Sequence, residues 1–323
     1  MRAAQVKAFG GPEVLAPVEM PDPVPGLGEV VIDVAYADTI FVETQVRTGW
    51  GRDFFSVTPP YVPGGGVSGV VSSLGADVPG DWLGRRVTAY VTGSYAERAL
   101  APVTALTVVP DSLDLLQAAA LVHDGVTASG LLELTGIDDT DRVLVLGASG
   151  GMGTLLIQLA HARGARVVGV ARGAAKVALV RELGADAAVD ATHPDWAAAA
   201  RTAVGGSPEA ADVVLDGVGG ELGATAFPLT ADGGRFSAHG APSGGFSPVD
   251  PDEAARRSIT LFGIGDVQFT PADLRRYMSA ALTEAAAGRL RPVIGEVFPL
   301  ERAAEAHAAI EGRGLVGKVL LKM

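Results

Sequence analysis

The feature that most restricts the possible folds is a glycine-rich loop directly after an apolar segment. Residues 142–146 (RVLVL) are almost continuously apolar, as expected for a strand buried on both faces. The loop 147–153 (GASGGMG) follows, and then apolar residues recur at helical spacing over about 154–163. A second apolar segment occupies 166–171. A strand, loop, helix and strand in this order predict a parallel α/β unit.

The loop has the spacing Ala148-x-Gly150-x-x-Gly153. Gly150 would let the backbone approach a pyrophosphate, and Gly153 would let the helix pack closely on the strand. The free N–H groups at the helix N-terminus favour phosphate. The pattern predicts a dinucleotide site; the alternative is a tight turn with only a structural role.

The end of the second strand indicates which dinucleotide binds. An NAD site usually has Asp or Glu there, whereas this chain has Arg172 and Lys176 and no carboxylate before Glu182. Two cations suit a 2′-phosphate, so we expect NADPH as the cofactor. The alternative is that both side chains are solvated at a helix start.

The chain as a whole shows two patterns of predicted secondary structure. Short β-like segments separated by Gly and Pro dominate residues 1–110 and suggest a small barrel-like domain. From Asp111 onward strand-like and helix-like segments alternate, which predicts a doubly wound parallel sheet. The predicted fold class is therefore α/β.

Charge and composition exclude several functions. The net charge of −12 disfavours nucleic-acid binding. There is no cysteine and the five histidines are dispersed, so no metal site is expected. With no apolar run of about 18–20 residues and no apolar N-terminal signal, we expect a soluble cytoplasmic protein without a membrane partner.

At this point the sequence resembles the zinc-free quinone oxidoreductase-like branch of the medium-chain dehydrogenase/reductase superfamily, over essentially its whole length. The matching segments are 143–153, Glu182-Leu183-Gly184-Ala185-Asp186, Asp216-Gly217-Val218-Gly219-Gly220, 93–97, 124–128 and 317–320. The resemblance implies a GroES-like β-rich catalytic domain (1–118 and 267–323) plus a Rossmann NADPH-binding domain (119–266). It also implies a homodimer.

The same resemblance implies a set of cofactor-binding residues. They are Thr127, Ser149, Gly150, Gly151, Met152, Gly153, Arg172, Lys176, Val218, His239, Gly240 and Ile264.

The chain departs from the zinc-dependent relatives at their ligand positions. The matching positions are approximately Ile40, Gly65-Gly66 and Asp124, so two of three ligands are missing and no metal is expected. It also departs from the quinone reductases, which often have Asn where Ile40 falls and Tyr near Gln45. A more apolar substrate pocket is expected as a result.

Three residues are candidates for protonating or polarising the acceptor. His123 precedes a segment that the resemblance places at the site, and its ordinary pKa suits proton transfer. Asp124 occupies a metal-ligand position of zinc relatives, and Tyr95 lies in Ser-Tyr-Ala-Glu. Each has a structural alternative: a packed or capping histidine, a helix cap and a core tyrosine.

These observations predict a zinc-independent, NADPH-dependent oxidoreductase that transfers hydride to a quinone or to an activated C=C bond (enone) of a small molecule. Two alternatives remain open. One is a carbonyl reductase or alcohol dehydrogenase of the same superfamily, and the other is a non-catalytic NADPH-binding protein.

Overall fold

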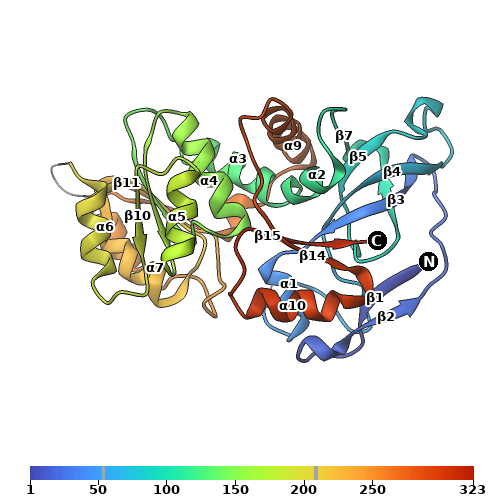
Figure 1. Cartoon of the computed structure of the whole chain (residues 1–323), viewed down its shortest axis with the longest axis horizontal. Helices are drawn as coiled ribbons and strands as arrows, with labels where there is room; N and C mark the ends of the chain where they lie inside the picture. Colours follow the sequence, from blue (N-terminus) through green and yellow to red (C-terminus); the bar gives the residue numbers. More distant parts are fainter. Residues whose placement is uncertain (53–54, 207–209) are drawn as a thin grey trace. The chain divides into compact units, whose positions relative to one another are not determined.

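The computed structural model describes residues 1–52, 55–206 and 210–323. The chain divides into two compact units: unit 1 is Met1–Val126 with Pro271–Met323, and unit 2 is Thr127–Thr270 (Figure 1). The functional boundaries expected at 118/119 and 266/267 stay a prediction, because compactness does not show which residues serve the cofactor.

Unit 1 is built on a seven-stranded sheet in the order β14-β15-β3-β4-β5-β7, with β6 pairing β3 beside this path. Every pairing in it is antiparallel except β14 with β15. The hairpin β1-β2 stands apart from the sheet. The strands are β1 (Arg2–Val6), β2 (Leu15–Glu19), β3 (Glu29–Asp38), β4 (Gly66–Leu74), β5 (Arg86–Tyr90), β6 (Arg98–Pro102), β7 (Leu106–Val108), β14 (Ile294–Pro299) and β15 (Lys318–Lys322).

In the described ranges, four α-helices of 7 to 16 residues lie wholly within unit 1. They are α1 (Phe41–Arg47), α2 (Leu115–Leu121), α9 (Pro271–Ala286) and α10 (Ala303–Glu311). Asp114 caps α2 by accepting the Gln117 N–H at 2.7 Å. Helix α3 (Asp124–Leu134) begins in unit 1 and continues into unit 2.

Unit 2 contains a six-stranded sheet in the order β10-β9-β8-β11-β12-β13, and every pairing is parallel. This confirms the predicted doubly wound sheet. The strands are β8 (Arg142–Leu146), β9 (Arg166–Ala171), β10 (Ala187–Asp190), β11 (Ala211–Asp216), β12 (Thr230–Ala238) and β13 (Thr260–Phe262). The chain order reverses between β8 and β11, which is where ligands bind in sheets of this kind.

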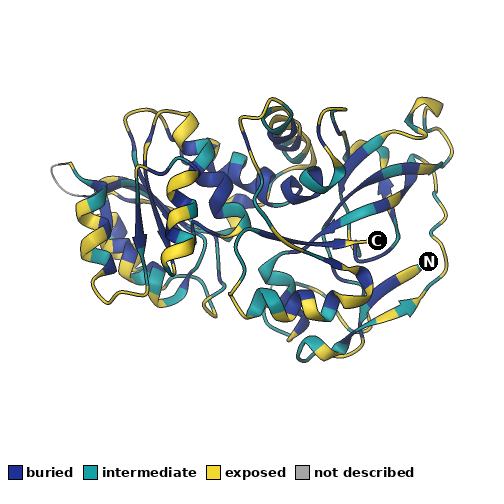
Figure 2. Cartoon of the chain, viewed as in Figure 1, coloured by how far each residue is buried: buried dark blue, intermediate teal, exposed yellow. Residues whose placement is uncertain are grey.

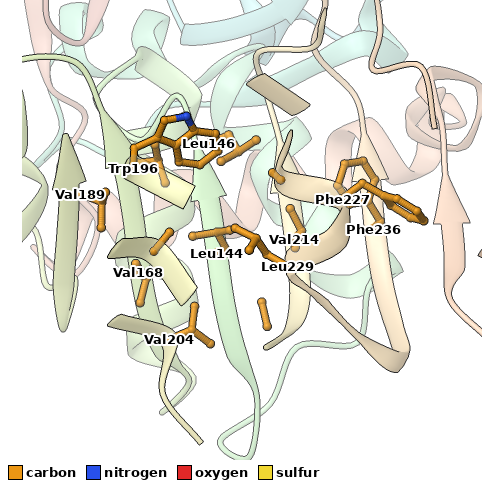
Figure 3. Close-up of a cluster of buried hydrophobic side chains, with 14 of the residues drawn as sticks. Leu144, Leu146, Val168, Val189, Trp196, Val204, Val214, Phe227, Leu229 and Phe236 are labelled. Atoms are coloured by element: carbon orange, nitrogen blue, oxygen red, sulfur yellow. The ribbon is translucent and has the colours of Figure 1, made fainter. Parts of the chain in front are cut away.

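The helices of unit 2 cover this sheet. They are α4 (Gly151–Ala162), α5 (Ala174–Glu182), α6 (Trp196–Val204), α7 (Gly220–Ala226) and α8 (Pro251–Arg256). Alternate residues of β8, Leu144 and Leu146, pack with Trp196 and Val204 of α6 in one buried cluster (Figure 3). The central strands are buried, while α5 and α6 keep exposed outer faces (Figure 2). The glycine loop is thus carried by a rigid core strand.

Short strands were expected over residues 1–110, and β1, Arg2–Val6, is the first of them. The short strands β2, β6, β7 and β14 had no clear alternation in the sequence and were not predicted. In the described part of the chain no single helix is long and apolar enough to cross a membrane; α2 and α3 meet that test only together, bent by 43°.

Candidate functional site

The glycine loop of unit 2 is fixed by its own backbone. Gly147 has a φ of +70°, which favours glycine, and turns the chain as β8 ends. The Ala148 N–H donates to the Val170 carbonyl at 3.0 Å, which ties the loop to the end of β9. The Gly150 N–H donates back to the Gly147 carbonyl, also at 3.0 Å. The loop therefore has one defined conformation.

The two motif glycines have different surroundings. A Cβ at Gly153 would lie 2.2 Å from the Gly147 carbonyl oxygen, so α4 packs on the loop only with glycine there. Gly150 is exposed, and a Cβ there would make only an ordinary contact at 3.4 Å. The first N–H groups of α4, from Gly151 onward, have no acceptor within the helix. Together with Ser149, which is 8% exposed, they form a surface suited to a phosphate.

The loop after β11 lies beside the glycine loop. A Cβ at Gly147 would lie 2.9 Å from Val218 Cγ2. Asp216, fully buried at the end of β11, accepts the N–H groups of Val218 and Gly219 at 2.9 Å each. The Ser247 hydroxyl donates to its other oxygen. Asp216 thereby holds Val218 in place.

The segment after β12 completes this edge of the sheet. The N–H groups of His239 and Gly240 both donate to the Asp216 carbonyl at 3.1 Å. The Nδ1 atom of His239 lies 3.1 Å from the Ser237 hydroxyl, while its buried Nε2 has no partner. Burial lowers the pKa of His239 below its usual range, so the ring is neutral near pH 7. The structure therefore brings three predicted segments together.

Arg172 and Lys176 lie at the end of β9 and in the first turn of α5. Arg172 is exposed and Lys176 is half-buried. Burial, and then the positive charge of Arg172, lower the pKa of Lys176, so the two cations are electrostatic neighbours. Asp190 ties the backbone between them to β10 by accepting the Gly173 N–H at 2.9 Å. The two cations therefore share this part of unit 2 with the carboxylate of Asp190.

The positions of two other predicted cofactor residues, Thr127 and Ile264, do not indicate whether they contact a cofactor. Thr127 is buried in α3 (7% exposed). Ile264 opens the 3-10 helix η5 (Ile264–Val267), shortly after the carboxyl end of β13. Their predicted role in cofactor binding stays a prediction.

In unit 1, His123 is held at its backbone and at its ring. Its N–H donates to Asp38 Oδ2 at 3.0 Å, and its Nδ1 lies 3.3 Å from the Tyr90 hydroxyl. Burial, against the opposing charge of Asp124, lowers the pKa of His123 to about 4. The imidazole is therefore neutral near pH 7. It can donate a hydrogen bond, but it is not an imidazolium acid.

Asp124 is buried and faces a cation. Its Oδ2 lies 3.1 Å from the Lys318 ammonium, which also lies 2.5 Å from Asp38 Oδ1. Although burial alone would lower the pKa of Lys318, Asp124 and Asp38 raise it above its usual value. The three side chains form a buried charge cluster.

Tyr95 belongs to a different polar network. Its side chain is 0% exposed and donates to Glu43 Oε2 at 2.7 Å, while His307 Nε2 lies 3.1 Å from the same hydroxyl. Glu43 also accepts the Ile40 N–H at 2.9 Å. Burial raises the pKa of Glu43 to about 7 and that of Tyr95 well above its usual value. These contacts tie α1 to α10.

Most of the positions that match the zinc ligands of relatives have no side-chain atom that could bind a metal ion. Ile40 and Gly66 have no side-chain oxygen, nitrogen or sulfur, and a Cβ at Gly66 would lie 3.3 Å from Asp38 Cβ. Over the described ranges, no group of three His, Cys, Asp or Glu side chains is arranged to hold a metal ion.

Sequence reasoning missed Asp38, Lys318 and Glu43. It also missed that Asp216 accepts hydrogen bonds from Val218, Gly219 and Ser247. A lysine at the start of the apolar run 318–321 was the one available signal, because an unpaired buried lysine is rare. Asp38 similarly ends the strand segment 29–38. Neither position indicates its partner.

Comparisons with known proteins agree with this geometry. Residues 26–111 match the alcohol dehydrogenase GroES-like domain, and residues 151–283 match the zinc-binding dehydrogenase family. The chain is 32% identical over 328 residues to a quinone oxidoreductase of Mus musculus, covering 99% of this chain and 97% of the relative. It is 30% identical over 335 residues to a 2-haloacrylate reductase of a Burkholderia species, covering 99% and 98%.

Solved structures are similar along the whole chain. A mycobacterial protein complexed with NADPH has a TM-score of 0.92 at 31% identity, covering 100% of both chains. An NAD-dependent alcohol dehydrogenase has a TM-score of 0.89 at 31% identity, again with full coverage of both. The predicted GroES-like and Rossmann fold class is confirmed. The chain belongs to the quinone oxidoreductase-like branch of the medium-chain dehydrogenase/reductase superfamily.

Proposed function

We propose that this chain is a zinc-independent, NADPH-dependent oxidoreductase that transfers a hydride to a quinone or to an activated C=C bond of a small molecule. The relative named quinone oxidoreductase supports the first acceptor class. The relative named 2-haloacrylate reductase supports the second, because an acrylate has a C=C bond conjugated to a carboxylate. The mycobacterial complex supports the cofactor.

The main observation is the meeting of three loops at the carboxyl ends of β8, β11 and β12. The glycine loop, the turn held by Asp216 and the His239-Gly240 segment lie side by side at the point where strand order reverses. Free N–H groups of α4 face this edge, and this is the usual place for a dinucleotide.

The residues present fit NADPH. Ser149 to Gly153 would hold the pyrophosphate, and Arg172 with Lys176 would pair with the 2′-phosphate. Two adjacent cations, one of which has a lowered pKa, are stabilised by an incoming dianion. The unpartnered Nε2 of His239 offers one more polar contact. Thr127, Val218, Gly240 and Ile264 are proposed to complete the contacts.

The reduced nicotinamide supplies the hydride when it is bound. The chain itself then has to orient the acceptor and stabilise the oxygen that becomes negative. A neutral His123 can donate a hydrogen bond to that oxygen, with Tyr90 fixing the ring through Nδ1. We assign this role to His123, a positioning role to Asp124 and a scaffold role to Tyr95.

The side chains at the ligand positions support zinc independence. With Ile40 and Gly66 there, Asp124 alone cannot build a tetrahedral site, which needs three protein ligands. The acceptor oxygen must then be polarised by hydrogen bonding.

The test is turnover by protein stripped of metal with a chelator. We expect NADPH oxidation with quinones and with enones, at unchanged rate after zinc is added. Reduction of aldehydes alone, or oxidation of alcohols with NAD, would favour the alcohol dehydrogenase alternative suggested by one similar structure. NADPH binding without turnover of any acceptor would identify a non-catalytic NADPH-binding protein.

We further propose a cytoplasmic homodimer that does not bind nucleic acid. β13 is an edge strand of the unit 2 sheet, and its Leu261 is 38% exposed, so a second copy can pair there. Sedimentation of wild type and Leu261→Lys tests the dimer, which should dissociate in the variant. The charge of −12 repels phosphate backbones.

A further inference from the structure

Unit 1 contains three charged side chains that water hardly reaches. Asp38 ends β3, Asp124 opens α3 and Lys318 opens β15, and their side chains are 2%, 8% and 5% exposed. The Lys318 ammonium lies 2.5 Å from Asp38 Oδ1 and 3.1 Å from Asp124 Oδ2. One ammonium thus pairs with two carboxylates from two other elements.

The fold brings these residues together from distant parts of the sequence. β15 pairs with β3 so that Leu320 lies opposite Asp38, two residues beyond Lys318. Gly66 leaves the necessary room, since a Cβ there would lie 2.6 Å from Val122 Cγ1 and 3.3 Å from Asp38 Cβ. The turn before α3 can therefore lie against the end of β3.

The cluster holds the dipeptide His123-Asp124 at two points. Lys318 binds the Asp124 carboxylate directly. Asp38, fixed by Lys318 through Oδ1, uses Oδ2 to accept the His123 N–H at 3.0 Å. Removing the ammonium would release both residues, because both carboxylates would then move towards water.

Stability alone does not account for such a cluster. Burying ions costs solvation free energy, and well-packed apolar side chains of similar volume often stabilise a protein equally well or better. The ammonium also has little access to solvent, so it is not a group that meets a ligand. Its distinctive consequence is the fixed position of His123, whose ring is tethered separately by Tyr90.

We propose that Lys318 is a positioning residue of the reduction, which through Asp38 and Asp124 holds His123 where it polarises the acceptor oxygen. This inference rests on the proposed function. It goes further by naming a residue that affects the rate without contacting substrate or cofactor.

The test compares Lys318→Met and Lys318→Arg with Arg235→Met, a matched loss of the cation from an ion pair with Asp141 inside unit 2. For each variant, kcat, KM for a quinone, Kd for NADPH and the isotope effect with NADPH deuterated at C4 are measured. Lys318→Met should lower kcat by about tenfold or more, because transition-state hydrogen bonding is lost. KM and Kd should stay within about twofold.

The isotope effect distinguishes positioning from a structural role. It should rise in Lys318→Met, because the chemical step becomes slower than the others, and Lys318→Arg should restore most of kcat. If Lys318→Met loses no more kcat than Arg235→Met at an unchanged isotope effect, the proposal is overturned. A large rise in Kd for NADPH at normal kcat also overturns it. Absence of turnover in the wild type instead overturns the proposed function.

A second pair of variants covers the case that Lys318→Met does not fold. Asp38→Asn keeps a carbonyl oxygen that can accept the His123 N–H, whereas Asp38→Ala does not. We expect Asp38→Asn to retain at least about threefold more kcat than Asp38→Ala. Equal kcat values for the two would contradict the link from Lys318 through Asp38 to His123.

Discussion

Lys176 in unit 2 and Lys318 in unit 1 are both at least partly buried, yet the charges around them have opposite signs. Burial and the neighbouring Arg172 lower the pKa of Lys176. Burial opposes the charge of Lys318, but Asp124 and Asp38 more than offset it and raise that pKa. Lys176 therefore lies beside a second cation, which favours an incoming phosphate, whereas Lys318 lies between two carboxylates of the protein.

The difference separates a binding role from a positioning role. The repulsion between Lys176 and Arg172 would be relieved by an incoming anion, which favours binding of a ligand there. A cation between two buried carboxylates has no such capacity, and it fixes the elements that contribute those carboxylates. We therefore propose that the same residue type serves cofactor recognition in one unit and positioning in the other.

The largest expected contrast is in stability without cofactor. Lys318→Met should lower the free energy of unfolding by about 3 kcal/mol, because two buried carboxylates lose their counter-charge. Lys176→Met should change it by less than about 0.5 kcal/mol, since this side chain is only half-buried at the start of α5. Denaturant unfolding of both variants measures the contrast. Equal losses of unfolding free energy in the two variants would contradict the claim that only Lys318 neutralises buried carboxylates.

The next contrast is in cofactor preference. Arg172→Ala should weaken NADPH binding about tenfold, or about 1.4 kcal/mol, and leave NADH binding unchanged, because only the 2′-phosphate loses a partner. Arg256→Ala, an exposed arginine of α8, is the matched control. Fluorescence titration of each variant with both cofactors measures the preference. If both cofactors weaken equally, Arg172 has a structural role.

The smallest contrast concerns pH and Glu43, whose pKa is raised to about 7 mainly by burial. Because the folded pKa is above the unfolded value, the folded state binds this proton more tightly. The stabilisation is therefore complete in acid and is lost as pH rises through about 7. Wild type should lose at least about 1 kcal/mol relative to Glu43→Gln between about pH 5 and pH 8.

Comparing the two proteins at each pH cancels the other titrations. Burial lowers the pKa of His123 to about 4 and that of His307 to about 3, and these rings act in the opposite sense by destabilising the fold in acid. Asp190 in unit 2 provides the reverse case, since the N–H groups of Gly173 and Thr192 lower its pKa to about 2. Wild type should therefore lose stability relative to Asp190→Asn only as pH falls below about 4. A Glu43→Gln difference that is flat with pH would contradict the assignment.

Much of unit 2 could be predicted because its signals are local. The strand β8, the loop with Gly150 and Gly153, and the helix α4 follow one another within about 20 residues, and their order alone implies the parallel unit. Asp216 was recognised only as part of a motif. Its role in fixing the loop could not be predicted, because it accepts hydrogen bonds from the backbone N–H groups of Val218 and Gly219, which every sequence offers.

Unit 1 was less predictable because its site is assembled by topology. Asp38, Asp124 and Lys318 are far apart in sequence. The pairing of β15 with β3 brings Lys318 close to Asp38, and the room left by Gly66 lets the turn before α3 place Asp124 beside them. β7 has only three residues, and β14 contains Gly295 and Pro299, so neither strand shows a clear period of two in the sequence. The family resemblance identified His123 and Asp124 as candidates, but nothing in the sequence indicated that Lys318 holds them.

The central claim is that the strand-end loops of unit 2 bind NADPH and discriminate it from NADH. Fluorescence titration of the wild-type protein with both cofactors tests this most directly. We expect NADPH to bind at least about tenfold more tightly, as the pairing of Arg172 and Lys176 with a 2′-phosphate requires. If neither cofactor binds, the glycine loop is only a structural turn; equal binding of both would contradict the role of the cation pair.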